Sequence, residues 1–407
     1  MLRKFFVGII LILLLATSII FSHAINAQVL SKRVIVTFRQ DASQNIQDTI
    51  IEPFKAERVK RLSFINSQVL KLTSSQITAL SKNSKVLRVE EDAQAFALCH
   101  RWWHRCNTPT PTKGPSPTPT NTPTPTPPAL PQPIPWGVDR VDADNVWAST
   151  TADSVKVAVI DTGVDLDHPD LTGNIKGGVN TIQSWKNADD DNGHGSHVAG
   201  IIAALNNTVG VVGMGPEIDL YAVKVLNRNG SGYVSDIIEG IDWSINNNIN
   251  VINMSLGTTS DVVSFHDAVT AARNAGIVIV AAAGNSGPGN NTVIYPAKYP
   301  ESIAVSATDS LDGQPSFSSR GPEVDLAGPG VSIYSTYKNG GYATLSGTSM
   351  ATPHVAGAAA LVLATHPGFT PSQVQSYLEA NAEFLGSLSS DQQGFGLVDA
   401  EKAVLAP

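Results

Sequence analysis

Residues 136–407 alternate continuous apolar segments with helical stretches, and this alternation constrains the fold more than any other feature of the chain. Four of the apolar segments are rich in β-branched residues, namely 155–160, 220–225, 251–254 and 277–281. Strands that are apolar throughout are typical of a parallel sheet covered by helices on both faces. The expected fold class is therefore α/β, with the functional site beyond the carboxyl ends of the strands.

Two regions of different character precede this domain. Residues 32–98 mix strand-like and helix-like stretches and predict a small α+β unit of the ferredoxin-like type. Residues 107–133 are mostly Thr and Pro, and because proline fixes φ and lacks an N–H, this segment should be an extended linker without a core. We therefore expect an N-terminal unit over 32–98, a Cys/Trp segment and linker over 99–131, and the α/β domain over 132–407.

The first 27 residues have the order of a secretory signal peptide. Arg3 and Lys4 precede an apolar run over residues 5–21, and small residues follow as far as Ala27. The rival interpretation is an uncleaved membrane anchor, since the run is nearly long enough to span a bilayer. In either case the remainder lies outside the cytoplasm. We expect a secreted, extracellular protein that has no membrane contact once the signal is removed.

Composition excludes two classes of protein. The net charge of −8 and the lack of a basic run beyond the first few residues argue against nucleic acid as a partner. Two cysteines are too few for a disulfide framework, and no CxxC-type metal spacing occurs.

Four polar residues stand where a parallel sheet would expose them. Asp161 follows a buried strand, His194 and Ser349 each begin a small-residue helix, and Asn285 follows the strand at 277–281. Acyl transfer needs a nucleophile, a base, a carboxylate that orients the base and donors for the oxyanion. Each residue alone is more often structural, but the four together, in the order Asp, His, Asn, Ser, match one catalytic arrangement.

The motifs around these residues resemble the signatures of the subtilisin family over nearly all of residues 132–404. They are Asp161-Thr162-Gly163, His194-Gly195-Ser196-His197-Val198-Ala199-Gly200, Ala282-Ala283-Gly284-Asn285 and Gly347-Thr348-Ser349-Met350-Ala351-Thr352-Pro353-His354. The resemblance implies a serine endopeptidase that acts on protein or peptide substrates through an acyl-enzyme intermediate, as a monomer and without an organic cofactor.

The same resemblance implies a role for each residue of these motifs. Ser349 would be the nucleophile, His194 the general base and acid, and Asp161 the residue that orients His194. The Asn285 side chain and the Ser349 N–H would form the oxyanion hole. His197 and His354 lie inside the motifs but are expected to be structural. Apart from His194, the motifs contain no other histidine.

A substrate groove is also implied. Two segments would clamp an extended peptide as an added strand, a mode that relies on main-chain hydrogen bonds; they are Gly230-Ser231-Gly232 and Ser255-Leu256-Gly257. Val234, Ile237 and Leu256 match the apolar lining of the pocket for the fourth residue before the cut. Ile294 falls where many relatives have glycine at the floor of the primary pocket, so this pocket should be short.

The resemblance further implies a structural calcium site. Calcium takes six to eight oxygen ligands from carboxylates, amides and carbonyls. The expected ligands are the side chains of Gln132, Asp170 and Asn207 and the carbonyl groups of Leu205, Val209 and Val211. The other interpretation of this loop is an ordinary Asn-Asn turn.

Residues 32–98 resemble the inhibitor-like propeptide of the same family, whose tail lies in the active site like a substrate. This predicts a zymogen that cuts itself after Leu98 and whose propeptide acts as an intramolecular inhibitor. More than thirty residues separate Leu98 from Gln132, about 100 Å at ~3.1 Å per residue. The tail can therefore occupy the groove while Gln132 sits at the calcium site. Cys99 would become the new N-terminus and could pair with Cys106, or both could remain free thiols.

Three other functions compete with the protease. A binding protein on a degenerate protease scaffold would have lost one of the four active-site residues, yet all are present. A membrane-tethered surface protein on the Thr/Pro stalk would retain its N-terminal segment. An esterase or lipase would need a Gly-x-Ser-x-Gly elbow, which is absent around Ser349.

Overall fold

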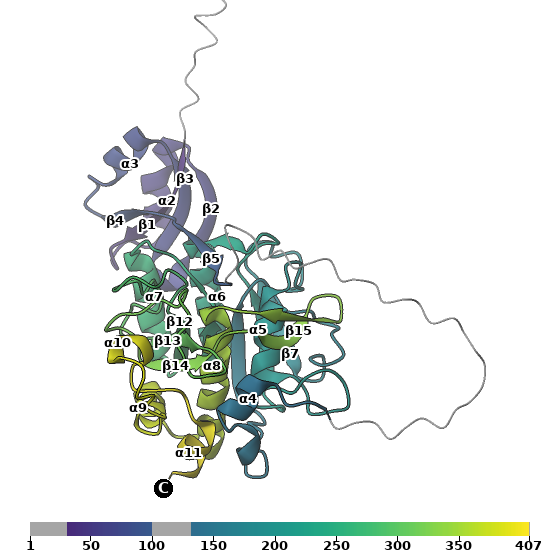
Figure 1. Ribbon diagram of the computed structural model, residues 1–407. Coiled ribbons are helices and arrows are strands. Elements are labelled where there is room, and N and C mark those ends of the chain that lie inside the picture. Colours follow the sequence, from purple (N-terminus) through teal and green to yellow (C-terminus); the bar gives the residue numbers. More distant parts are fainter. Residues whose placement is uncertain (1–30, 100–131, 407) are drawn as a thin grey trace, which may run out of the picture. The chain divides into compact units, whose positions relative to one another are not determined.

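The computed structural model describes residues 31–99 and 132–406 (Figure 1). They form two compact units, one ending at Glu91 and the other beginning at Asp92. The predicted signal peptide and nearly all of the predicted Cys/Trp segment and linker lie outside the described residues. Within the described ranges, no helix has the length and apolar character needed to cross a membrane.

The first unit is an antiparallel sheet with two helices. The strand order is β2-β3-β1-β4, with one helix after the first strand and one after the third, which is the ferredoxin-like arrangement. Its core lies between sheet and helices and includes Val36, Leu70 and Leu80. The expected α+β fold of this region is confirmed. The elements are β1 (Lys32–Phe38), α2 (Gln44–Ile51), β2 (Glu57–Leu62), β3 (Ser67–Leu72), α3 (Ser74–Leu80) and β4 (Val86–Glu91).

The second unit is built on a seven-stranded sheet in the order β14-β13-β12-β10-β6-β8-β7. Every neighbouring pair in it is parallel. β10 and β12 are buried along their whole length and β6 from Val157 onward, which explains the apolar sequence of these strands. The strands are β6 (Lys156–Asp161), β7 (Ile175–Asn180), β8 (Asp219–Lys224), β10 (Val251–Met254), β12 (Val278–Ala282), β13 (Ile303–Thr308) and β14 (Leu326–Pro329).

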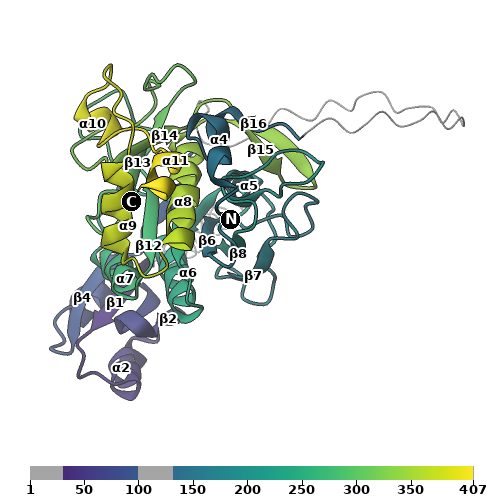
Figure 2. The same ribbon diagram turned by 90° about the horizontal axis from the view of Figure 1, so that it is seen from below.

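Helices cover both faces of this sheet, as the sequence predicts. α5 (His194–Ala203) and α8 (Thr348–Thr365) pack together on one face, while α6 (Val234–Asn246) and α7 (Val263–Asn274) pack together on the other (Figure 2). α8 is buried from Thr348 to Val362. Small residues allow it to approach its neighbours closely, since a Cβ on Gly357 would lie 2.3 Å from the Cβ of Met214. The remaining helices are α4 (Trp136–Arg140), α9 (Pro371–Ala380), α10 (Ser390–Gln393) and α11 (Ala400–Leu405).

Two small sheets complete the second unit. One is the hairpin of β15 (Ile333–Tyr337) and β16 (Gly341–Leu345). The other has the order β11-β5-β9 and contains β5 (Gln94–Ala97), β9 (Ser231–Tyr233) and β11 (Leu256–Gly257). Because β5 pairs only with strands of the second unit, the compact boundary falls at Glu91/Asp92, before the expected domain boundary at Leu98.

Candidate active site

Asp161 and His194 are brought together by the ends of two buried elements. Asp161 is the last residue of β6, and His194 is the first residue of α5. Both side chains are fully buried, and His194 Nδ1 lies 2.8 and 2.9 Å from the two carboxylate oxygens. A Cβ at Gly195 would lie 2.0 Å from the Gly163 carbonyl oxygen, so only glycine permits this approach of helix and strand.

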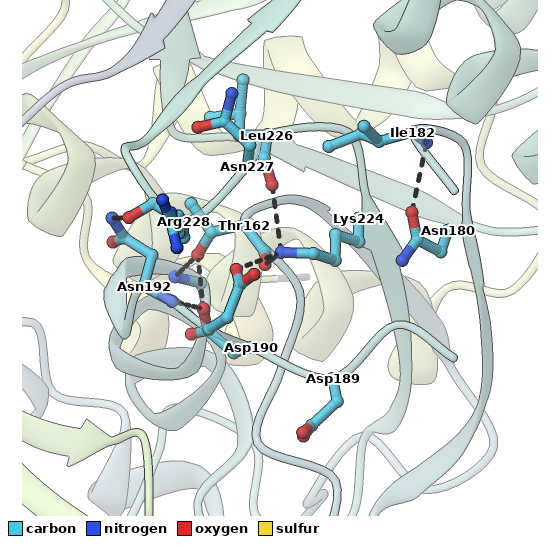
Figure 3. A network of polar contacts seen from close by, with 12 residues as sticks. Thr162, Asn180, Ile182, Asp189, Asp190, Asn192, Lys224, Leu226, Asn227 and Arg228 are labelled. Atoms are coloured by element: carbon cyan, nitrogen blue, oxygen red, sulfur yellow. Dashed lines mark hydrogen bonds and ion pairs between the residues drawn. The ribbon is translucent and has the colours of Figure 1, made fainter. Parts of the chain in front are cut away.

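The loop that leads into α5 is organised by a buried carboxylate that the sequence did not single out, Asp190. Its Oδ1 accepts hydrogen bonds from the N–H groups of Asn192 and Gly193 and from the Thr162 hydroxyl (Figure 3). Its Oδ2 accepts from both the N–H and the hydroxyl of Ser196. Burial raises the pKa of Asp190, and these donors oppose that rise. Asp190 therefore ties the residue after Asp161 to the turn before His194.

A buried lysine lies on the neighbouring strand and was also missed. Lys224 is the last residue of β8, directly beside Asp161 in the sheet register. Its Nζ donates to the carbonyl groups of Thr162 (2.5 Å) and Leu226 (3.1 Å) and to the Asp191 carboxylate (2.7 Å), as Figure 3 shows in part. All three ammonium donors are used. Lys224 thus links the residue after β6 to the segment after β8 and to the loop before α5.

Ser349 occupies the first turn of α8 and is fully buried. Its hydroxyl donates to the Ser255 carbonyl (2.8 Å) and accepts from the Leu98 N–H (3.1 Å). No hydrogen bond joins it to His194, whose Nε2 is buried and lacks a partner among the described residues. The Ser349 hydroxyl proton is instead directed at the Ser255 carbonyl.

The Asn285 amide has one orientation, because Thr348 determines it. Asn285 Oδ1 accepts from the Thr348 N–H and from its hydroxyl, both at 3.0 Å. Nδ2 is therefore directed away from Thr348 and donates to the Leu98 carbonyl at 2.8 Å. The other predicted donor, the Ser349 N–H, makes no hydrogen bond to this carbonyl within the described part of the chain. Thr348 is a third residue that sequence reasoning did not assign.

The two predicted groove segments hold a peptide of the chain itself. β5 lies antiparallel between β9 and β11, with Ala95 opposite Gly232 and Ala97 opposite Leu256. The Ala97 N–H donates to the Gly230 carbonyl (2.9 Å), and the Leu98 N–H donates to the Ser255 carbonyl (3.3 Å). The peptide bond after Leu98 thus lies beside Ser349 and Asn285.

The side chains of this peptide alternate between the protein and solvent. Ala95 is fully buried, whereas Phe96 is 48% exposed. The predicted pocket residues Val234, Ile237 and Leu256 are all buried, and the Val234 N–H donates to the carbonyl of Ala93, two residues before Ala95. This is the pattern expected of a strand bound with one face inward.

Asp92 anchors the start of the bound segment. Its carboxylate accepts hydrogen bonds from the Ser235 N–H (2.9 Å) and from the Ser235 hydroxyl (2.7 Å). Ser235 lies in the first turn of α6, where unsatisfied N–H groups and the helix dipole favour a negative charge. The sequence contained this signal, an acidic residue just before the substrate-like tail, but gave no indication of its partner.

Ile294 lies beside the groove segment that holds Leu98. Its side chain is only 9% exposed and packs against two glycines of the site. A Cβ at Gly257 would lie 2.6 Å from Ile294 Cδ1, and one at Gly284 would lie 3.1 Å from Cγ1. The isoleucine therefore fills space between the groove segment 255–257 and the loop after β12 that carries Asn285.

The six predicted calcium ligands converge on one loop. Nε2 of Gln132 lies 3.1, 2.6 and 2.5 Å from the carbonyl oxygens of Leu205, Val209 and Val211. Asp170 completes the cluster through a hydrogen bond from the Asn207 amide (2.9 Å). The Asp170 carboxylate is buried, which raises its pKa, and it also accepts from the Val211 N–H.

The chemistry of this cluster fits a cation. An amide nitrogen carries two N–H donors, so it cannot satisfy three converging carbonyl oxygens at once. Turning the Gln132 and Asn207 amides over would present oxygen in place of nitrogen, next to a buried carboxylate. The described residues hold no group of three or more His, Cys, Asp or Glu able to bind a metal. A cation here would instead depend on carbonyl and amide oxygens, which calcium accepts.

His197 and His354 are buried, and within the described ranges their rings form hydrogen bonds only with main-chain carbonyl groups. His197 Nε2 lies near the carbonyls of Ile333 and Ala343, and His354 Nδ1 lies near that of Met350. Desolvation lowers their pKa values, to about 3 for His197 and about 4 for His354, so both are neutral.

Cys99, directly after Leu98, is disulfide-bonded. Cys106, its predicted partner, lies outside the described residues.

Comparisons with known proteins agree with this geometry. Residues 152–396 match the profile described as the Subtilase family, Peptidase_S8. The chain is 40% identical to subtilisin E of Bacillus subtilis (strain 168), an alignment that covers 98% of this chain and 99% of the relative. It is 50% identical to a subtilisin of Bacillus pumilus, covering 67% of this chain and 99% of that protein. Subtilisin Savinase of Lederbergia lenta is 48% identical over the same shares.

Proposed function

This chain belongs to the subtilase family and is a serine endopeptidase, and we propose that Ser349 is its nucleophile, His194 its general base and Asp161 the residue that orients His194. Asp161 accepts a hydrogen bond from Nδ1–H, so the lone pair of His194 is on Nε2, which has no hydrogen-bond partner among the described residues. In this tautomer His194 can take the Ser349 proton as the hydroxyl attacks. Protonated His194 then donates to the leaving amine, and water hydrolyses the acyl-enzyme.

Asn285 would supply the electrostatic part of catalysis. Its Nδ2 already lies 2.8 Å from a carbonyl oxygen, and Thr348 prevents the amide from turning over. A donor fixed before the reaction stabilises the developing oxyanion without reorganisation. The Ser349 N–H, at the start of α8, would add a second donor as the carbonyl carbon becomes tetrahedral.

A single observation supports the proposal most strongly, namely the position of the Leu98 peptide. Its carbonyl accepts from Asn285, while its N–H lies 3.1 Å from Ser349 Oγ. We therefore propose that the protein is a zymogen, that residues 32–98 are its propeptide and intramolecular inhibitor, and that its first self-cleavage separates Leu98 from Cys99. The attack forms a bond between Ser349 Oγ and the Leu98 carbonyl carbon and releases the Cys99 amine.

Incubation of the purified protein with casein tests the activity, with and without a serine-directed covalent inhibitor. Proteolysis should stop when Ser349 is labelled, and peptide mapping should find the label there. N-terminal sequencing of the earliest processed form should give Cys-His-Arg-Trp. A first product beginning near Leu130 would contradict cleavage after Leu98, even if the enzyme is active.

Three further properties belong to this proposal. Calcium would be held by Gln132, Asp170, Asn207 and the carbonyls of the loop, where it would offset a buried carboxylate and fix the loop.

Residues 1–27 would direct the chain to secretion, and the extracellular enzyme would act as a monomer on extended segments of protein substrates. The many main-chain contacts of β5 support a groove that accepts varied sequences.

A further inference from the structure

The carbonyl group of Ser349 lacks its ordinary helical partner. In an α-helix this carbonyl accepts from the N–H four residues later. That residue is Pro353, which lies inside α8 and has no N–H. Ser349 is fully buried, so its carbonyl needs another donor to avoid the cost of an unsatisfied polar group.

Ser255 supplies this donor from a different part of the fold. Its hydroxyl donates to the Ser349 carbonyl at 2.9 Å, across 94 residues of sequence. Asn253, the third residue of β10, donates from Nδ2 to Ser255 Oγ at 3.0 Å. Because a serine hydroxyl has a single O–H, the bond from Asn253 leaves that proton directed at Ser349. Asn253 and Ser255 are both fully buried.

Ser255 also contacts the nucleophile and the bound peptide through its main chain. Its carbonyl accepts from the Ser349 hydroxyl at 2.8 Å and from the Leu98 N–H at 3.3 Å. Ser255, a residue of the groove segment, therefore contacts the peptide to be cut and both the hydroxyl and the carbonyl group of Ser349.

We propose that the Ser255 side chain, held by Asn253, is a positioning residue for the nucleophile. This inference rests on the proposed role of Ser349. Its hydrogen bond ties the first turn of α8 to the groove segment, so that Ser349 Oγ and the substrate carbonyl keep a reactive distance. Pro353 makes this possible, because it leaves the Ser349 carbonyl free to accept a bond from outside the helix.

Ser244 offers a matched control. Its hydroxyl donates to the Gly240 carbonyl at 2.8 Å within α6, and its side chain is also fully buried. Ser244→Ala and Ser255→Ala each remove one buried hydroxyl that bonds to a main-chain carbonyl. A difference in catalysis between them therefore cannot come from the loss of such a bond in general.

The two variants are compared on a peptide anilide with Ala-Phe-Ala-Leu before the scissile bond, with rates normalised to titrated active sites. Ser255→Ala should lower kcat by about ten- to a hundred-fold, the cost of a small misplacement of reacting groups. KM should stay within about threefold, because the main-chain carbonyl that binds the substrate N–H is retained. Ser244→Ala should leave both constants unchanged, with a smaller fall in melting temperature, because the Gly240 carbonyl keeps the Ser244 N–H as its helical partner. Equal kcat in the two variants, or a loss confined to KM, would overturn the proposal.

A second variant distinguishes the positioning of Ser349 from the mere supply of a hydrogen-bond donor to its carbonyl group. Pro353→Ala restores a helical N–H to the Ser349 carbonyl, so Ser255→Ala/Pro353→Ala should regain melting temperature but not kcat. Recovery of kcat as well would show that the carbonyl needs only some donor, and the positioning role would be wrong. If Ser255→Ala does not fold, Ser255→Cys replaces it, since a thiol fills similar space but donates weakly. If wild-type enzyme is not labelled at Ser349, the proposed function has failed; an active, labelled wild type with unaffected Ser255 variants refutes only this inference.

Discussion

The active site differs from the loop of the predicted calcium site, residues 205–211 and here called the cation loop, in the chemical groups that form it. The active site uses side chains at the ends of buried elements, such as Asp161 at the end of β6 and Ser349 at the start of α8. The cation loop uses mainly carbonyl oxygens between Leu205 and Val211, and its Gln132 comes from a distant segment. Val209 in this loop is 44% exposed, whereas Asp161 and Ser349 are fully buried.

This difference shows which of the two sites is oriented by the folded chain alone, without a bound ion. Thr348 fixes the Asn285 amide, and Asp161 fixes the tautomer of His194, so the catalytic groups are oriented without a ligand. In the loop, the Gln132 amide faces three carbonyls that it cannot fully satisfy. We therefore expect the catalytic groups to be insensitive to calcium and the stability of the loop to depend on it.

The substrate-like segment and Gln132 both reach their places in one uncleaved chain. Leu98 lies in the active site while Gln132 contacts the loop carbonyls. The predicted linker length allows this, since about 100 Å of extended chain separates the two residues. Calcium binding and self-cleavage should thus be independent events, and the following predictions test that independence.

The largest effect should come from Ser349→Ala. Loss of the nucleophile should reduce turnover by about a million-fold, the size known for subtilisin itself, and should leave the precursor uncut. Casein hydrolysis and gel analysis of the precursor measure both effects, with Ser244→Ala as a control that should process normally. The proposed role of Ser349 is wrong if the purified variant still matures.

Asn285→Leu should be the next largest. The change removes the amide donor at similar size and should lower kcat by roughly a hundred- to a thousand-fold, again the range known for subtilisin. KM should change little, because the oxyanion exists only in the transition state. Steady-state kinetics on the same anilide check this. A kcat near that of wild type would exclude Asn285 from the oxyanion hole.

Ile294→Gly should change specificity rather than the overall rate. Leu or Met before the cut should be preferred over Phe or Tyr in the wild type, because Ile294 fills the space between Gly257 and Gly284. The glycine variant should shift the kcat/KM ratio toward aromatics by roughly 10- to 100-fold, the usual range for pocket size effects. Ile294→Leu, which keeps the volume, should not. An unchanged profile in a peptide library would show that this residue does not shape the pocket.

Calcium should have the smallest effect and act on stability alone. A ligand that binds only the folded state adds about 2.7 kcal/mol at a hundred times its Kd, so chelation should lower the melting temperature by several degrees. Asp170→Ala should abolish the response, and Asp153→Ala, which removes an exposed carboxylate, should not.

The uncut Ser349→Ala precursor offers the sharpest version of this test. It should respond to calcium as strongly as the mature enzyme, because Gln132 already contacts the loop before cleavage. A response seen only after processing would contradict the independence of the two sites. No response to chelator in either form would argue against the calcium site itself.

The sequence by itself determined the fold class and the identity of the catalytic candidates. Apolar strands without alternation require burial on both faces, and so predicted the parallel sheet before any contact was known. Asp161, His194, Asn285 and Ser349 lie in short motifs whose order along the chain is distinctive. The predicted propeptide tail, groove segments and calcium ligands came from the resemblance to the family, and the structure brings the residues of each set close together.

Only the tertiary structure decided how these groups are held. Asp190, Lys224 and Thr348 act through hydrogen bonds to residues of other segments, and even Thr348, which lies inside a motif, has no local feature that identifies Asn285 as its partner. The bond from Ser255 to Ser349 spans 94 residues, and the register that creates it depends on the packing of α8 against β10. Local sequence specifies which residue types are present, whereas the direction of a hydroxyl or an amide depends on partners that only the folded chain brings within about 3 Å.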